Sequence, residues 1–151
     1  MRPLSGTQPE TTGARYRDVG ELLAAAREGL RRLAPREAAA AQRAGDIIVD
    51  TRPAWQRAVE GEIVGSLIVE RNHLEWRLDP FSGAQVPQAR AGQRWIVVCS
   101  EGYSSSLAAA SLRAIGVDAT DMIGGVRQWV LDGLPVVAGL TAVEAIVAKP
   151  E

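Results

Sequence analysis

The sequence contains little cysteine and histidine and almost no net charge, and each scarcity excludes a class of function. A single cysteine, Cys99, excludes a disulfide framework within the chain. One cysteine and one histidine, His73, provide too few ligands for a Cys/His zinc site, and we expect neither a metal nor an organic cofactor. A formal net charge of −1 at pH 7 creates no basic field, so we expect neither nucleic acid nor a membrane as a partner.

Long apolar segments are also missing. No apolar run approaches the length of a membrane span, and residues 1–16 lack the apolar core of a signal peptide. Because a lone cysteine fits a reducing compartment, we expect a cytoplasmic protein. Residues 1–16 are rich in Pro, Gly, Thr and Ser, which predicts a disordered tail, and residues 17–151 are long enough for one domain.

Helical and strand patterns alternate along residues 17–151. Apolar spacing and capping residues predict helices over residues 18–29, 35–44, 53–60, 105–115 and 125–133, and a last helix over residues 141–148. Apolar runs predict strands over residues 46–50, 67–69, 95–99 and 119–123, with a short edge strand over residues 30–33. This alternation predicts an α/β fold with a central, mostly parallel five-stranded sheet and helices on both faces.

The residues that best suggest chemistry are 96–116, where a β-branched run ends on Cys99, a small polar loop follows, and a helix begins near Ser105. In open parallel sheets, ligands bind beyond the carboxyl ends of the strands, which places the thiol where chemistry usually occurs. The first N–H groups of the helix favour an anion there, so Cys99 is the candidate nucleophile. The alternative is a small buried side chain at the end of a core strand.

The loop after Cys99 is the candidate substrate-binding segment. Its backbone N–H groups can surround the sulfur or a bound anion, and a glycine within it permits a backbone conformation closed to other residues. The segment comprises Ser100, Glu101, Gly102, Tyr103, Ser104 and Ser105, and the alternative is an ordinary turn with an N-cap serine. It contains no cation, which Arg71 or Arg77 can supply from elsewhere, and a dyad of His73 with Cys99 is a further alternative.

Asp50 and Arg52 are candidate supporting residues. They stand at the end of a strand that we expect beside the cysteine-bearing strand, so a charge pair between them can steady the site. The alternative is a solvated surface pair worth less than ~1 kcal/mol.

Four separated segments, taken in order, resemble a single-domain rhodanese, which is a sulfurtransferase-type domain. They are Ile48-Val49-Asp50-Thr51-Arg52, Gly61-Glu62-Ile63-Val64-Gly65-Ser66, Ile96-Val97-Val98-Cys99 with Gly102 and Ser105, and Gly124-Gly125-Val126 through Trp129 to Gly133-Leu134-Pro135. The resemblance implies that Cys99 takes a sulfane sulfur from a donor, holds it as a persulfide and passes it to a thiophilic acceptor. It also implies the partners: thiosulfate, another small sulfur-containing anion or a persulfide as donor, and a protein or small thiol as acceptor.

The chain departs from this family at two positions. Glu62 stands where the family usually has histidine, and Ser104 stands where many thiosulfate-using members have arginine. Two other functions therefore stay open. One is a non-catalytic rhodanese-like module that binds a partner or senses redox state. The other is a cysteine-based phosphatase or arsenate reductase, whose arginine would fall at Ser104 or Ser105.

Overall fold

The computed structural model describes residues 13–138. Most of the expected tail and all of the expected helix over residues 141–148 lie outside these residues. The central sheet is parallel and has the strand order β3 (Leu67–Ile68), β1 (Ile47–Asp50), β4 (Arg94–Val98) and β5 (Asp118–Asp121). The expected α/β fold with a mostly parallel central sheet is therefore confirmed.

The fifth strand, expected over residues 30–33, is reduced to a single bridge. Leu33 pairs in parallel with Met122 beyond the end of β5, through hydrogen bonds of 3.0 and 2.8 Å to Asp121 and Ile123. The ladder stops there because Pro35, which has no N–H to donate, begins the next helix two residues later.

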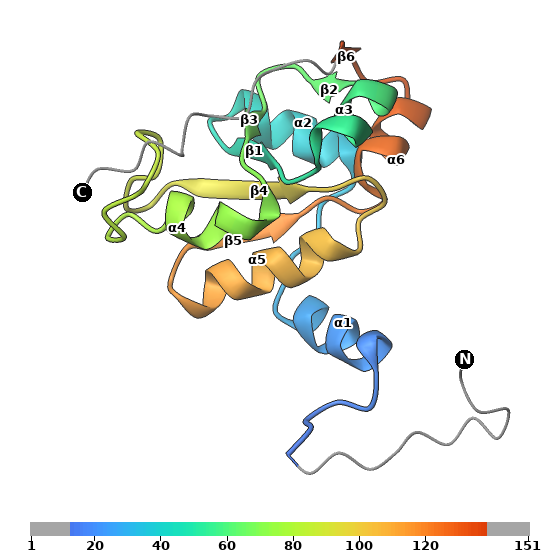
Figure 1. The fold of residues 1–151 in the computed structure, drawn as a ribbon. Helices are drawn as coiled ribbons and strands as arrows, with labels where there is room; N and C mark the ends of the chain where they lie inside the picture. The colour runs from blue at the N-terminus through green and yellow to red at the C-terminus, as the bar shows by residue number, and fades with distance from the viewer. Residues whose placement is uncertain (1–12, 139–151) are drawn as a thin grey trace, which may run out of the picture.

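Helices cover both faces of the sheet (Figure 1). On one face lie α2 (Pro35–Arg43) and α6 (Gly125–Leu131), with α3 (Ala54–Glu60) beside them. On the other lie α5 (Ser104–Ala114) and α4 (Leu74–Leu78), which follows the 3₁₀ turn η1 (Arg71–His73). Alternate strand residues face each way: Val49 and Val97 pack toward α5, whereas Ile48 and Ile96 pack toward α6. Each face therefore has its own apolar core.

Two smaller features surround this layered structure. The helix α1 (Val19–Glu28) packs on the outer side of α5 and contains no buried residue (Figure 1). A two-stranded antiparallel sheet joins β2 (Glu62–Ile63) to β6 (Val136–Val137). The sequence did not predict this second sheet, because two strands of two residues each show no recognisable periodicity.

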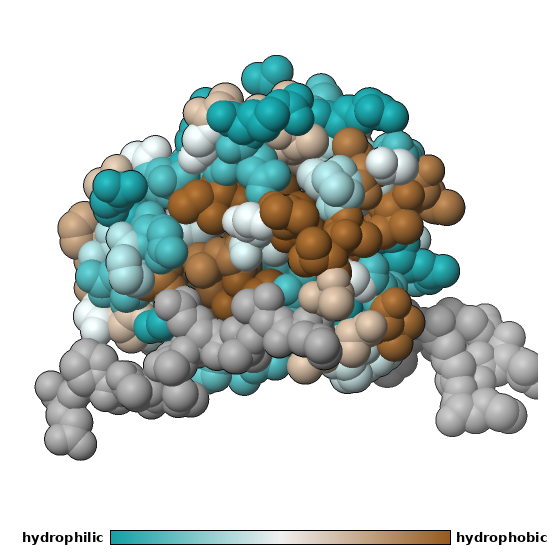
Figure 2. All heavy atoms as spheres, turned by 90° about the horizontal axis from the view of Figure 1, so that it is seen from above, coloured by the Kyte–Doolittle hydropathy of each residue, from teal (hydrophilic) through white to brown (hydrophobic). Residues whose placement is uncertain are grey.

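The face that carries α3, α6 and β6 exposes apolar side chains (Figure 2). Val59 is 80% exposed on α3, Leu131 is 79% exposed on α6, and Val137 is 51% exposed on β6. Among residues 13–138, no helix combines the length and apolar character needed to cross a membrane.

Candidate active site

Cys99 lies at the carboxyl end of the central strand β4, as the sequence predicted. The two flanking strands end at the same edge of the sheet, since Asp50 is the register partner of Val98 and Asp121 is that of Val97. A short loop then leads from Cys99 into α5, which begins at Ser104. The thiol, two carboxylates and the start of a helix are therefore brought to one edge.

The loop curls around the sulfur. Cys99 is only 7% exposed, and the backbone N–H of Gly102 donates to its Sγ at 3.2 Å. The start of α5 adds N–H groups that have no acceptor within the helix and carry partial positive charge. Tyr103, 60% exposed, and Ser104 lie at the outer surface of the loop. The sulfur is thus buried, with one peptide N–H bonded to it and the start of α5 close by in the chain.

Close contact with the start of α6 fixes the loop from behind. The carbonyl oxygens of Cys99 and Ser100 accept hydrogen bonds from the N–H groups of Val126 (2.9 Å) and Arg127 (3.1 Å). A Cβ on Gly125 would lie 2.4 Å from the Ser100 oxygen, so only glycine allows this approach. These contacts explain why glycine stands at position 125, the first residue of α6.

Asp50 and Arg52 form a buried pair rather than a solvated one, with exposures of 0% and 1%. Arg52 donates through Nη2 to Asp50 at 2.6 Å and through Nη1 to Glu60 at 3.1 Å. Burial opposes the charge of Arg52, but hydrogen bonds to Asp50 and Glu60 outweigh it and raise the pKa of the guanidinium. The other carboxylate oxygen of Glu60 accepts from the hydroxyl of Ser100 at 2.6 Å. Contacts therefore run continuously from β1 through α3 to the loop.

Glu62, which stands where the rhodanese pattern usually has histidine, is also buried. Glu62 is 3% exposed and forms an ion pair with Arg57, which is 1% exposed. Histidine at this position would leave the buried guanidinium without that carboxylate. Glu62 therefore supports α3 rather than contributing a surface contact.

Asp121 is a site residue that the sequence analysis missed. Its carboxylate is fully buried and accepts hydrogen bonds from the hydroxyls of Ser105 (2.8 Å) and Ser106 (2.7 Å) and from Arg32 (2.8 Å). The hydroxyl of Ser105, a predicted substrate contact, is thus directed to Asp121. Like Asp50, Asp121 is an acidic residue at the end of a strand beside β4, and this pattern in the sequence could have indicated it.

The cations near the loop are not the ones that the sequence suggested. Arg71 forms an ion pair with Glu75, and Arg77 donates to the carbonyl oxygen of Ala84. Within residues 13–138, the arginines that contact the loop are instead Arg27, Arg32 and Arg127. The first two donate to the carbonyl oxygen of Gly102 at 2.8 and 3.0 Å, and the third pairs with Glu101 at 2.8 Å. No spacing in the sequence indicated these contacts, since Arg27 and Arg32 precede the loop by 75 and 70 residues.

His73 lies in η1, and no hydrogen bond within residues 13–138 joins it to Cys99. In the same part of the chain, no three His, Cys, Asp or Glu side chains form a group that could hold a metal ion. The chemistry that this edge supports is that of a buried thiol with the Gly102 N–H bonded to its sulfur.

Comparison with known proteins agrees with this architecture. The family model of the rhodanese-like domain matches residues 34–132. A search of curated protein sequences finds no match. A Rhodopseudomonas palustris protein of unknown function, described as a possible tyrosine phosphatase, superposes with a TM-score of 0.74 and 27% identity. That match covers 87% of this chain and 100% of the other.

Two further structures share the fold at lower identity. A rhodanese-related protein from Thermoplasma volcanium has a TM-score of 0.60 and 20% identity, over 72% of this chain and 98% of its own. Thiosulfate sulfurtransferase from Pseudomonas aeruginosa has a TM-score of 0.57 and 23% identity, over 76% of this chain and 21% of its own.

Proposed function

Because the chain belongs to the rhodanese-like domain family, we propose that it is a sulfurtransferase in which Cys99 carries the transferred sulfur. The observation that supports this most directly is the hydrogen bond from the Gly102 N–H to Sγ, in a loop whose first two carbonyl oxygens are bound by α6. With those oxygens directed away, the loop presents N–H groups to the sulfur, and an anionic sulfur is what such groups stabilise.

The proposed reaction has two steps. The Cys99 thiolate attacks the sulfane sulfur of the donor, a new S–S bond forms, and the bond to the leaving group breaks. Sulfite leaves with the electron pair when the donor is thiosulfate, and a thiolate leaves when the donor is a persulfide. An acceptor nucleophile, such as cyanide or a thiol, then attacks the outer sulfur of the Cys99 persulfide and releases the thiolate. The sulfur moves between nucleophiles, so the cycle requires no external oxidant or reductant.

The loop would contribute binding and stabilisation in this cycle. Gly102 and the first N–H groups of α5 stabilise negative charge on the inner and outer sulfur atoms. Tyr103 and Ser104, at the outer surface, contact the donor and acceptor as they enter. The buried Asp50–Arg52 pair and Glu60 hold the hydroxyl of Ser100 in place. We place this reaction in the cytoplasm, which the single cysteine supports.

Intact-protein mass spectrometry tests the proposal. The purified protein is mixed with thiosulfate and, separately, with a low-molecular-weight persulfide. We expect a one-sulfur adduct that is absent in Cys99→Ala and disappears when cyanide or a thiol is added. If neither donor yields the adduct, sulfur transfer is wrong and the domain is better described as a binding or redox-sensing module.

A phosphatase activity, which the description of the R. palustris protein raises, has less support from this site. An arginine that clamps a tetrahedral oxyanion would replace Ser104 or Ser105, and the Ser105 hydroxyl is bound to Asp121. We therefore expect no hydrolysis of an aryl phosphate above the level of Cys99→Ala. A steady release of phosphate that depends on Cys99 would reverse this preference.

A further inference from the structure

Two arginines from outside the family-matched residues meet at one atom of the loop. Arg27, in the last turn of α1, and Arg32, in the connection to α2, both donate to the carbonyl oxygen of Gly102. The family match begins at residue 34. The segment before residue 34 therefore brings two cationic contacts to the loop from outside the family match.

Both guanidinium groups are fixed by a second partner. Arg27 also donates through Nε to the hydroxyl of Ser106 at 3.0 Å, and Arg32 binds both carboxylate oxygens of the buried Asp121 at 2.8 and 3.2 Å. The Ser106 hydroxyl in turn donates to Asp121 at 2.7 Å. The two cations are thus held in fixed positions against the Gly102 carbonyl.

The geometry of the Gly102–Tyr103 peptide group links the two arginines to the opposite side of the loop backbone. In a planar trans peptide the C=O and N–H bonds point in opposite directions, so the N–H of Tyr103 is turned away from the two arginines. The two guanidinium groups that donate to the carbonyl oxygen also polarise the peptide, which makes that N–H a stronger donor. The adjacent peptide already directs the Gly102 N–H to the sulfur.

We propose that Arg27 and Arg32 are positioning residues for the Cys99 loop, holding and polarising the Gly102–Tyr103 peptide so that its N–H stabilises the outer sulfur of the persulfide. This rests on the function proposed for Cys99. The arrangement compensates for Ser104, the position where many family members carry a cation. Here the positive charge acts through a peptide group instead of touching the donor.

The character of α1 agrees with this role. Its residues are not buried in either core, and it packs on the outer side of α5 (Figure 1). Through Arg27 it reaches the loop, where the guanidinium also lies over the ring of Tyr103 at 5.8 Å. A helix that contributes little to the core but contacts two groups of the loop, the Gly102 carbonyl and the Tyr103 ring, is well placed to control its geometry.

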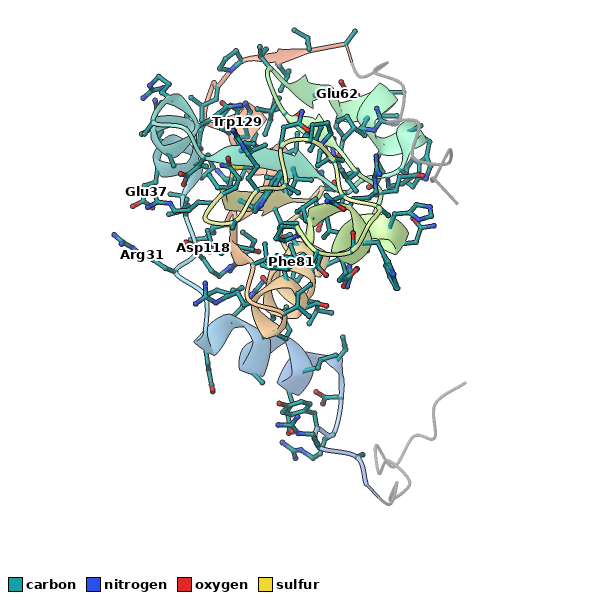
Figure 3. All side chains as sticks on the ribbon, turned by 90° about the vertical axis from the view of Figure 1, so that its left-hand side faces the viewer. Arg31, Glu37, Glu62, Phe81, Asp118 and Trp129 are labelled. Atoms are coloured by element: carbon teal, nitrogen blue, oxygen red, sulfur yellow. The ribbon has the colours of Figure 1, made fainter. Side chains whose placement is uncertain are left out.

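The test compares Arg27→Gln with Arg27→Lys and with the control Arg31→Gln. Arg27→Gln leaves the Gly102 oxygen bonded to Arg32 and the Ser106 hydroxyl bonded to Asp121, so the fold is expected to persist. Arg31 is exposed and its side chain extends away from the fold (Figure 3), so its loss changes net charge alone.

Steady-state transfer of sulfur from thiosulfate to cyanide gives the first readout. We expect Arg27→Gln to lower kcat about tenfold, which is less than the ~100-fold loss typical of deleting a direct oxyanion donor, because the arginine acts through a peptide. The KM for the donor should change by less than about twofold, since the guanidinium does not touch the donor. Arg27→Lys, which keeps the charge, should recover most of the rate, and Arg31→Gln should match the wild type.

The rate of Cys99 alkylation by iodoacetamide gives a second readout that needs no sulfur transfer. At a fixed pH of about 6, where an ordinary thiol is protonated, we expect slower alkylation in Arg27→Gln, by about threefold, and no change in Arg31→Gln. If the wild type formed no persulfide, the proposed sulfur transfer would be wrong. The alkylation rates of the wild type, Arg27→Gln and Arg31→Gln would still show whether Arg27 controls the loop around Cys99.

Two results would overturn the inference. One is wild-type kcat and wild-type alkylation in Arg27→Gln. The other is a raised KM with unchanged kcat, which would mean that the arginine attracts the donor. Arg32→Lys guards against a folding defect, because a single ammonium group can keep the ion pair with the buried Asp121 but cannot also donate to Gly102. Arg27→Lys differs because the partners of Arg27 are the Ser106 hydroxyl and the Gly102 oxygen, so the ammonium group can still donate to Gly102. Arg32→Lys should reproduce the loss of kcat with an unchanged thermal midpoint.

Discussion

Gly102 is the residue of the loop with the least freedom to change. Its backbone has φ +85°, which side chains rarely adopt, and a Cβ there would lie 2.8 Å from the backbone nitrogen of Gly124. Its N–H contacts the sulfur, and its carbonyl oxygen accepts from Arg27 and Arg32. One residue therefore combines a backbone requirement, a packing limit and a hydrogen bond to the nucleophile.

We expect Gly102→Ala to reduce sulfur transfer at least about tenfold and to destabilise the fold by about 1–3 kcal/mol, because the loop must shift to relieve strain. Activity assays and urea unfolding measure the two effects. Gly92 is a matched control, since it has the same φ of +85° but no atom within 4 Å of its Cβ position. Gly92→Ala should lose about 1 kcal/mol and keep full activity. Equal loss of activity in both variants would contradict the role of the loop geometry.

At the residue scale, the sequence predicted positions better than environments. It placed Cys99 at a strand end and selected Asp50 and Arg52, but it left open whether that pair was solvated. The partners of Arg52 come from the end of α3, where Glu60 and the C-cap residue Gly61 provide a carboxylate and a carbonyl oxygen. The residues next to Asp50 and Arg52 in the sequence do not show which other parts of the chain will pack against the pair.

At the scale of elements, segments with clear periodicity were predicted closely. The sequence indicated residues 35–44 and 46–50 where the structure has α2 and β1. The second sheet and the bridge at Leu33 were not predicted in this form, because each depends on pairing between short segments far apart in the chain. The contacts of Arg27, Arg32 and Asp121 with the loop have the same origin. They follow from the packing of α1 on α5 and of β5 beside β4.

The contact between α4 and α5 provides a pH-dependent test at this scale. Glu75 on α4 accepts a hydrogen bond from the hydroxyl of Ser111 on α5 at 2.6 Å and pairs with Arg71. Burial opposes ionisation of Glu75, but the hydrogen bonds from Ser111 and Arg71 outweigh it and lower the pKa from its ordinary value of 4.5. The stabilisation from this carboxylate is therefore present above pH 4.5 and is lost as the pH falls through the lower, folded-state value.

We expect Glu75→Gln to be less stable than the wild type by about 1 kcal/mol or less at neutral pH, because water screens a partly exposed pair. The difference should shrink as the pH is lowered below the ordinary pKa of the carboxyl group. Urea unfolding of both proteins at a series of pH values measures it. A stability difference that stays constant down to acidic pH would show that the charge of Glu75 makes no contribution.

For the whole molecule, the charges around the loop nearly cancel. The cations are Arg27, Arg32, Arg52 and Arg127, and they are opposed by Asp50, Glu60, Glu101 and Asp121. The chain as a whole has a net charge of −1. The site thus has no positive field to attract the doubly charged thiosulfate. A persulfide donor with a single charge depends less on such attraction. Donor preference should follow the charge balance of the site rather than the nucleophile alone.

Glu101→Gln tests this balance because it releases Arg127 from an exposed ion pair beside the loop, where the two side chains are 53% and 61% exposed. We expect kcat/KM for thiosulfate to rise about two- to fivefold at low ionic strength and the gain to fade at high salt, since salt screens exposed charges. Asp118→Asn makes the same change in net charge, but Asp118 pairs with Arg113 at the start of β5, the end of that strand opposite to Asp121 (Figure 3). An equal gain in both variants would attribute the effect to overall charge, and no gain in Glu101→Gln would mean that Arg127 does not reach the donor.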